Sequence, residues 1–237
     1  MDNHVLSQRP ALHAEQVLIK AMLAGSFPPG SVLPGERSLA AQLGVTRPTL
    51  REVLQRLERD GWITIRHGKA TVVNDFWRDG GLNVLSALVR YGEQLPDGFI
   101  PNLLEVRLAL APAYTRAAVT RSAAVVAELL NRSDDLDDVP EAFAAFDWQL
   151  HRTLTICSGN PIYTLILNGF AGFYEQMARL YFAQPEARAS SRSFYAALRG
   201  AALSGDAGEA ERVARQVLAE SIALWQSGAA RYHWEER

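Results

Sequence analysis

The sequence contains very little cysteine and no long apolar run. Cys157 is the single cysteine among 237 residues, so an internal disulfide framework is excluded and a reducing cytoplasm is the natural compartment. Neither a signal peptide nor an apolar stretch long enough to cross a membrane is apparent. We therefore expect a cytoplasmic protein with no membrane partner, long enough for two domains.

Common catalytic signatures are also missing. The sequence has no nucleophile elbow, P-loop, dinucleotide fingerprint or Cys-x-x-Cys pair, and Cys157 has no adjacent base. Asp147 and His151 are the one pair that could form half of a hydrolytic metal centre, and that interpretation predicts turnover of an ester or thioester. The pattern as a whole favours a protein that is not an enzyme.

Charge is low and unevenly divided. The whole chain has a net charge of −2, and residues 1–75 hold nine Lys and Arg against seven Asp and Glu, a net charge of +2, which leaves −4 for the remainder. A near-neutral chain can still bind DNA, because only the docking surface must displace phosphate counterions. The larger, acidic part is expected to stay off the duplex.

The segment from Leu33 to Val73 predicts a winged helix-turn-helix, which is a DNA-binding fold. Apolar spacing predicts one short helix, then a tight turn at Gly44, then a second helix that ends at Asp60 and Gly61. A β hairpin follows. The predicted elements are a helix over 38–43, a helix after Thr46, strands over 62–65 and 70–73, and a turn over 67–69.

The second helix has the features of a recognition helix. Thr46 is suited to its N-cap, and Pro48 falls in the first turn, where a missing N–H costs little. Arg47 and Arg51 recur at a spacing of four, opposite the apolar positions Leu50, Val53, Leu54 and Leu57. A guanidinium so placed can read guanine in the major groove, although a solvated helix face has the same spacing.

The predicted hairpin has a basic tip. Arg66, His67 and Lys69 surround Gly68, which suits contact with phosphate or the minor groove. A structural hairpin with incidental charges is the alternative. The two preceding helices favour the DNA-binding interpretation.

These motifs resemble the GntR family of bacterial transcription regulators. The family has Leu-Pro-x-Glu-Arg before helix two and Val-Ser/Thr-Arg-x-Thr-x-Arg-Glu at helix three, which match residues 33–37 and 45–52 here. The resemblance implies a homodimer on a pseudo-palindromic operator in double-stranded DNA. It departs at Pro48, where one branch of the family has a further threonine that contacts DNA, so one contact is expected to be missing. The implied DNA-binding residues are Arg37, Thr46, Arg47, Thr49, Arg51, His67, Gly68 and Lys69.

The rest of the chain is predicted to be helical. Residues 74–81 contain Asp79, Gly80 and Gly81 among aromatic residues, and they are interpreted as a connector stiffened by packed aromatic rings. Six or seven amphipathic segments between residues 82 and 237, among them 103–110, 117–130 and 162–182, predict an antiparallel bundle. The expected fold is mainly α, with a winged helix-turn-helix domain (1–73), a linker (74–81) and an all-helical effector domain (82–237).

This bundle has features that suggest a ligand cavity. Gly169 and Gly172 interrupt a helical segment, and aromatic residues are frequent around them. Core packing and a tight helix crossing explain the same pattern. The residues alone leave both interpretations open.

Further segments resemble the fatty-acid-responsive branch of the GntR family, among them residues 27–30 (FPPG), 158–163 (SGNPIY) and 181–188 (YFAQPEAR). That resemblance implies a long-chain acyl-coenzyme A effector in the bundle and no cofactor. By the same resemblance, Arg107 pairs with a phosphate, Ser221 bonds a polar group, Trp225 stacks on adenine, and Tyr174 and Tyr181 line the tunnel. The alternatives without ligand binding are an ion pair of Arg107, for example with Glu175, and core packing of Trp225.

A metal site is the remaining hypothesis. Asp147 and His151 lie four residues apart, on one helical face, as in related GntR regulators that hold a divalent ion with two further histidines. Those histidines fall here at Tyr195 and at about Ala219. Two ligands seldom make a stable site, so a local hydrogen bond between Asp147 and His151 is expected and no metal. The alternative is a regulator of the same family that responds to a different small acid, with metal help from Asp147 and His151.

Overall fold

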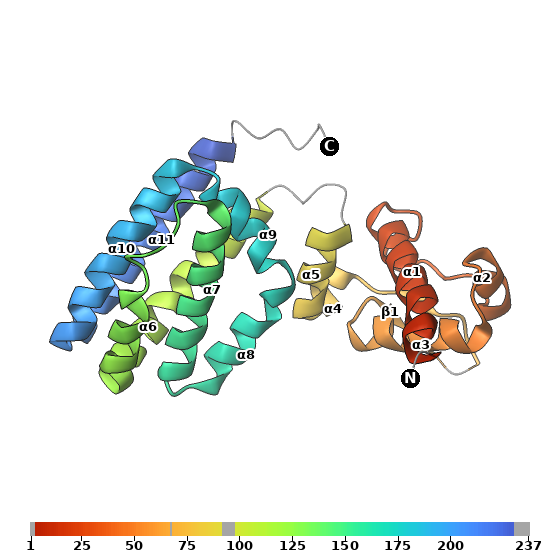
Figure 1. The fold of residues 1–237 in the computed structure, drawn as a ribbon. Coiled ribbons are helices and arrows are strands. Elements are labelled where there is room, and N and C mark those ends of the chain that lie inside the picture. Colours follow the sequence, from red (N-terminus) through yellow and green to blue (C-terminus); the bar gives the residue numbers. More distant parts are fainter. Residues whose placement is uncertain (1–2, 67, 92–97, 230–237) are drawn as a thin grey trace. The chain divides into compact units, whose positions relative to one another are not determined.

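The structure is a computed structural model that describes residues 3–66, 68–91 and 98–229. The chain divides into two compact units, Met1–Leu95 and Pro96–Arg237. Figure 1 shows a small unit of helices with one short hairpin and a larger unit built from helices alone. The mainly α fold predicted from the sequence is confirmed.

The N-terminal unit is built on three helices. Helix α1 packs across α3, and α2 packs beside α3. Apolar side chains such as Leu18, Met22 and Leu50 are buried where these helices meet. The elements of this unit are α1 (Asn3–Leu23), α2 (Glu36–Gln42), α3 (Arg47–Arg59), β1 (Ile63–Thr64), β2 (Val72–Val73), α4 (Phe76–Asp79) and α5 (Leu82–Tyr91).

Helix α3 forms as its sequence predicts. Thr46 is the N-cap, and its hydroxyl accepts a hydrogen bond from the backbone N–H of Thr49 at 3.3 Å. Pro48 stands in the first turn. Leu50, Val53, Leu54 and Leu57 are buried, whereas Arg47 and Arg51 are exposed. Helix α2 begins two residues earlier than predicted, because Glu36 occupies its first turn, where a carboxylate is favoured by the helix dipole.

The hairpin is shorter than its sequence suggests. Strand β1 pairs antiparallel with β2 through Ile63 with Val73 and Thr64 with Val72. The backbone N–H of Ile65 donates to the Glu58 carboxylate at 2.8 Å instead of extending the ladder. Gly68 has a φ of +69°, as the predicted turn requires. His67, a predicted DNA contact, lies outside the described residues.

The segment after the hairpin is packed against it. Asn74 accepts from the Thr64 hydroxyl at 2.7 Å and donates to the Gly61 carbonyl at 3.1 Å. The ring of Phe76 lies 4.9 Å from that of Trp62, between centroids. Helix α5 then packs against α1 within the same unit. The predicted boundary between residues 81 and 82 stays a prediction.

Gly61 is required where this segment crosses the end of α3. Its φ is +88°, and a Cβ built there would lie 2.5 Å from the Asp79 carbonyl oxygen. We expect Gly61→Ala to destabilise the N-terminal unit by more than the roughly 1–3 kcal/mol of backbone strain alone. Urea unfolding followed by circular dichroism measures the change.

Gly30→Ala is the matched control, because Gly30 has a φ of +83° and nothing within 4 Å of its built Cβ. Gly30→Ala is expected to lower the free energy of unfolding only by the cost of backbone strain. An equal loss of unfolding free energy in the two variants would show that the contact with Asp79 is unimportant.

The C-terminal unit is a bundle in which α6, α10 and α11 pack on one another and α7 packs on α6 and α9 (Figure 1). Its core includes Leu130, Phe143, Leu150, Leu154 and Leu198. No helix in the described part of the chain is long and apolar enough to cross a membrane. The helices are α6 (Phe99–Asn131), α7 (Pro140–Cys157), α8 (Pro161–Gly169), α9 (Ala171–Phe182), α10 (Pro185–Ser204) and α11 (Ala207–Ala229).

Two of the predicted segments differ from the observed helices. The apolar runs over 103–110 and 117–130 belong to one helix, α6, which contains Pro112 and is kinked at Ser122, where the backbone leaves helical geometry. The run predicted over 162–182 is broken at Phe170, directly after Gly169, into α8 and α9. Both glycines named as interruptions lie at or next to this break.

Candidate functional site

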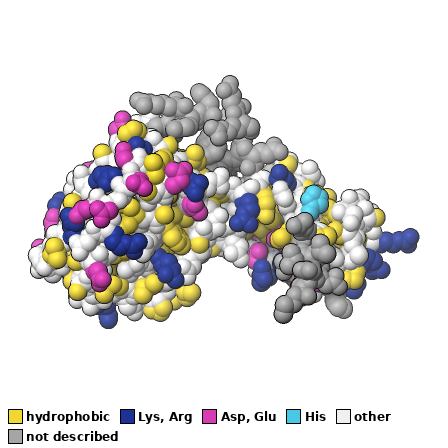
Figure 2. Space-filling view, in the orientation of Figure 1, with side chains coloured by type: hydrophobic (Ala, Val, Ile, Leu, Met, Phe, Trp, Pro, Cys, Tyr) yellow, Lys and Arg dark blue, Asp and Glu magenta, His cyan; other side chains and the backbone are white. Residues whose placement is uncertain are grey.

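The described residues among the predicted DNA contacts lie on α2, at the beginning of α3 and at the turn of the hairpin. Figure 2 shows Lys and Arg side chains at the end of this unit that carries α2 and α3. The hairpin adds Lys69 to the set. Arg37, Thr46, Arg47, Arg51, Gly68 and Lys69 are exposed, and Thr49 is half-buried. The direct contacts of these residues with DNA stay a prediction.

Thr46 and Thr49 have a structural role at the beginning of α3. The Thr46 hydroxyl caps α3 through the Thr49 N–H, and the two hydroxyl oxygens are 2.9 Å apart. A cap of this kind typically stabilises a helix by about 1 kcal/mol. Thr46 therefore sets the beginning of the recognition helix and with it the position of Arg47.

Glu36 links Arg47 and Arg51, the two arginines that are predicted to read DNA. Its Oε2 accepts from Arg51 Nε at 2.8 Å and lies 3.7 Å from Arg47 Nη2. Because Glu36 is on α2 and the arginines are on α3, the carboxylate holds two guanidinium groups together at one place on the surface. This role was not foreseen from the sequence, although Glu36 belongs to the family motif quoted above.

We expect Glu36→Gln to reduce sequence discrimination. An exposed ion pair is worth about 0.2–1 kcal/mol, so its loss frees the arginines at little cost in stability. Binding to random duplex is expected to tighten and cognate binding to gain less, which lowers the ratio of specific to non-specific affinity by up to about fivefold. Anisotropy titrations with a DNA fragment selected by the wild-type protein and with random duplex measure the ratio.

Glu52→Gln provides the control, because it makes the same charge change on α3 at an exposed residue. Its ratio of specific to non-specific affinity should equal that of the wild type. If both variants lower the ratio equally, the effect is general electrostatics and not the arrangement of the arginines.

The C-terminal unit contains a cavity of about 100 Å³ among α6 to α11. Its walls are mainly aliphatic and aromatic side chains, for example Leu103, Phe173 and Met177. The five predicted effector residues all line it: Arg107, Tyr174, Tyr181, Ser221 and Trp225. The structure thus brings together side chains from helices far apart in the sequence, while their individual roles stay predictions.

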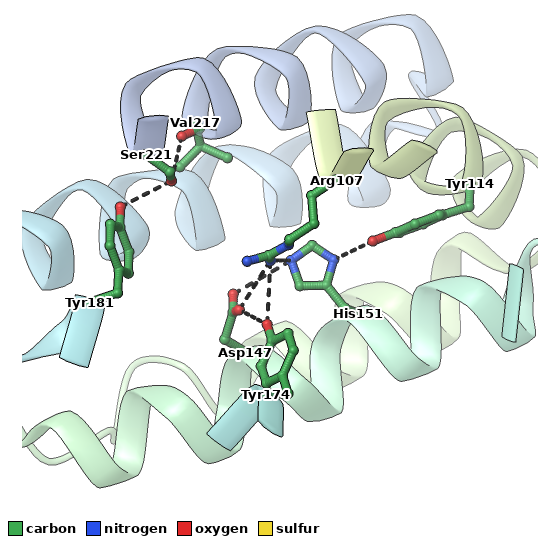
Figure 3. A network of polar contacts seen from close by, with 8 residues as sticks. All are labelled: Arg107, Tyr114, Asp147, His151, Tyr174, Tyr181, Val217 and Ser221. Carbon is green, nitrogen blue, oxygen red and sulfur yellow. Dashed lines mark hydrogen bonds and ion pairs between the residues drawn. The ribbon is translucent and has the colours of Figure 1, made fainter. Parts of the chain in front are cut away.

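A polar network occupies one part of this cavity (Figure 3). Arg107 Nη2 lies 3.4 Å from Asp147 Oδ2, 2.9 Å from His151 Nε2 and 3.3 Å from the Tyr174 hydroxyl. The Tyr174 hydroxyl donates to Asp147 Oδ2. His151 Nδ1 lies 2.7 Å from the hydroxyl of Tyr114.

The contacts determine the tautomer of His151. A guanidinium only donates hydrogen bonds, so Nε2 of His151 accepts from Arg107. The ring proton is then on Nδ1 and is donated to Tyr114.

The charges of the network are stabilised by one another. Burial raises the pKa of Asp147, but the positive charge of Arg107 and a hydrogen bond from Tyr174 lower it, and that pKa lies well below its usual range. Burial raises the pKa of the Tyr174 phenol above its ordinary value. Asp147 is therefore ionised and Tyr174 is a protonated donor at neutral pH.

A second polar pair lies apart from this network in Figure 3. The Tyr181 hydroxyl donates to Ser221 Oγ at 3.0 Å, and Ser221 donates to the Val217 carbonyl at 2.8 Å. Ser221 is buried, and Trp225 one turn later is half-buried. This pair offers polar contacts at a different part of the cavity from Arg107.

Asp147 and His151 do not form the expected direct hydrogen bond. Both side chains contact Arg107 instead. His151 Nε2 and Asp147 Oδ1 are 3.6 Å apart, which is too long for a hydrogen bond. A divalent ion there would face a guanidinium, so these residues do not fit a metal. Within the described residues, no three His, Cys, Asp or Glu side chains could hold an ion together.

The alternative role of Arg107, an ion pair between helices, is present in the structure, but its partner is Asp147 and not Glu175, the example suggested. Glu175 pairs with Arg179 at 2.6 Å, one turn along α9, whereas Arg107 pairs with Asp147. Tyr114 was missed by the sequence analysis. It lies seven residues after Arg107 on α6, and this spacing, which places both on one helical face, was the available signal.

Comparison with known proteins identifies the families that match the two parts of the chain. The family described as "Bacterial regulatory proteins, gntR family" matches residues 10–73, and the family described as "FadR C-terminal domain" matches residues 74–233. The fatty acid metabolism regulator protein of Shewanella pealeana is 44% identical over 221 residues, covering 92% of this chain and 91% of the relative. Its counterpart from Yersinia pestis is 48% identical over 191 residues, covering 81% and 80%.

Solved structures agree on the fold. The structure titled "Lar controls the expression of the Listeria monocytogenes agr system and mediates virulence" matches with a TM-score of 0.54 at 17% identity. The match covers 94% of this chain and 97% of that one. At this identity the likeness concerns the fold alone.

Proposed function

Because the chain belongs to the GntR family of bacterial regulatory proteins and carries the FadR C-terminal domain, it is a DNA-binding transcription regulator of fatty acid metabolism, and we propose that long-chain acyl-coenzyme A releases it from its operator. It is a regulator and not an enzyme. We further propose that it acts in the cytoplasm as a homodimer, with one recognition helix in each of two successive major grooves.

The observation that carries this proposal is the cavity in the helical unit. An acyl chain needs an apolar enclosure with a few polar groups, and this cavity has aliphatic and aromatic walls with separate polar clusters at Arg107 and Ser221. Tyr174 and Tyr181 belong to these walls. The flat face of Trp225 suits stacking on adenine.

Release of DNA follows from linkage. If acyl-coenzyme A binds more tightly to a conformation whose two recognition helices are wrongly spaced, ligand and operator oppose each other. The helical segment after the hairpin supports this coupling, since Asn74 and Phe76 attach it to the DNA-binding unit. A movement of that segment is then transmitted to the hairpin.

A thermal-shift panel tests the choice of ligand. At a free concentration of 100 times its Kd a ligand stabilises by about 2.7 kcal/mol, which corresponds to about 5–10 °C for a protein of this size. We expect this shift with oleoyl-coenzyme A and much smaller shifts with coenzyme A or zinc chloride. A large shift with a divalent metal or a small hydroxy acid, and none with the thioester, would favour a different effector.

A further inference from the structure

The polar network in the cavity has balanced charge. Among the described residues that line the cavity, the charged side chains are Arg107 and Asp147. Their side chains are 26% and 10% exposed, and they form an ion pair at 3.4 Å. His151 accepts from Arg107, and Tyr174 is a protonated donor. The positive charge of Arg107 is therefore balanced by the carboxylate of Asp147.

We propose that Asp147 makes this cavity select the uncharged thioester of an acyl chain over the carboxylate of the free fatty acid. This inference rests on the proposed function, because it assumes that the acyl chain enters this cavity. It assigns to Asp147 a task in ligand selection in place of metal binding. It also assigns to Arg107 a neutral partner instead of a phosphate.

Asp147 would repel the carboxylate of a free fatty acid in this cavity. A fatty acid carboxylate beside Arg107 would share the guanidinium with Asp147, whose carboxylate is held ionised. Two carboxylates at one partly buried cation repel each other strongly, because the surroundings screen them poorly. The free acid would have to take up a proton or displace Asp147, and either requirement weakens binding.

Arg107 also has hydrogen-bond donors left for the carbonyl oxygen of a thioester. All contacts of the Arg107 guanidinium with the described residues use Nη2. The Nη1 and Nε atoms make no hydrogen bond with the described residues, and the side chain keeps 26% of its surface exposed. A guanidinium has five N–H donors, and an uncharged carbonyl oxygen can accept from this second edge without disturbing the bond to Asp147.

Three ligands distinguish the sources of selectivity in the wild-type protein. They are oleoyl-coenzyme A, oleate and S-oleoyl-N-acetylcysteamine, which keeps the thioester but has no phosphate. Calorimetry below the micelle concentration of each ligand gives the affinities. Because a like-charge contact is costly, we expect the phosphate-free thioester to bind at least about tenfold more tightly than oleate. Equal affinities would overturn the proposal and place selectivity in the phosphates.

Asp147→Asn is the variant that tests the residue. It leaves Arg107 uncompensated, so oleate binding should tighten by at least about tenfold, while the affinity for S-oleoyl-N-acetylcysteamine changes much less. The double variant Asp147→Asn with Arg107→Gln is neutral again and should lose the gain. An unchanged affinity for oleate in a folded Asp147→Asn protein would overturn the proposal.

Asp138→Asn is the matched control. It removes one negative charge from the same unit at an exposed residue that pairs with Arg188, so oleate binding should stay at the wild-type level. If Asp138→Asn raises the affinity for oleate as much as Asp147→Asn does, the effect is due to net charge and not to the position of Asp147. If Asp147→Asn does not fold, the wild-type comparison of the three ligands decides.

Two different experimental outcomes would contradict the proposed function and the role of Asp147. If oleoyl-coenzyme A neither binds nor releases operator DNA, the proposed function fails. If it does both, while oleate and S-oleoyl-N-acetylcysteamine bind alike, only the role of Asp147 is wrong.

Discussion

Arg47→Ala is expected to abolish specific DNA binding. Arg47 is exposed in the first turn of α3, where recognition helices reach base edges. A bidentate contact of arginine with guanine is worth about 1–3 kcal/mol of discrimination, so the two half-sites of a dimer together lose at least about 30-fold in affinity. Mobility shifts with cognate and random duplex at physiological salt measure this loss.

The same variant should keep its response to the effector. Arg47 is in the N-terminal unit and the cavity is in the C-terminal unit, so the thermal shift with oleoyl-coenzyme A is expected to equal that of the wild type. Arg59→Ala is the control, because Arg59 is an exposed arginine at the other end of α3. Undiminished binding of cognate duplex by Arg47→Ala would refute the assignment of α3 as the recognition helix.

Saturating oleoyl-coenzyme A is expected to raise the Kd for the operator substantially. Coupling free energies between two sites are typically about 1–3 kcal/mol, which is about 5–150-fold in affinity. Trp225→Ala should blunt this increase without weakening the binding of DNA by the ligand-free protein, because the half-buried Trp225 side chain lines the cavity. Mobility shifts with increasing thioester concentration give both quantities.

Trp225→Phe separates the loss of an aromatic face from the loss of packing, since it keeps a ring for stacking. We expect it to retain most of the response. If Trp225→Ala responds like the wild type, adenine stacking at this position is excluded. If the thioester tightens operator binding, the direction of the proposed linkage is wrong.

Helix α3 could be predicted from the sequence because the interactions that determine it are local. Thr46 caps the helix through a residue three positions away, and the spacing of Leu50, Val53 and Leu54 determines which face is buried. Such interactions depend on a few neighbouring residues and on helical geometry. The antiparallel bundle was predictable for the same reason, although its breaks at Ser122 and Phe170 were not.

The cavity was only partly predictable. Helical spacing could place Asp147 and His151 on one face, and resemblance could name Arg107, but neither indicated that the three meet. Arg107 is 40 residues from Asp147 and 44 from His151 in the chain. Which faces of distant helices approach each other depends on the packing of the whole bundle, and no local pattern encodes it.

The sequence by itself determined that this protein reads DNA, because capping, apolar periodicity and the arginine spacing act within one short helix. The tertiary structure alone decided that Glu36 joins the two recognition arginines and that Arg107 is neutralised by Asp147. Both are contacts between different helices. Their charges act on each other only after packing has brought the side chains within a few ångströms, since ion pairing in water falls off over short distances.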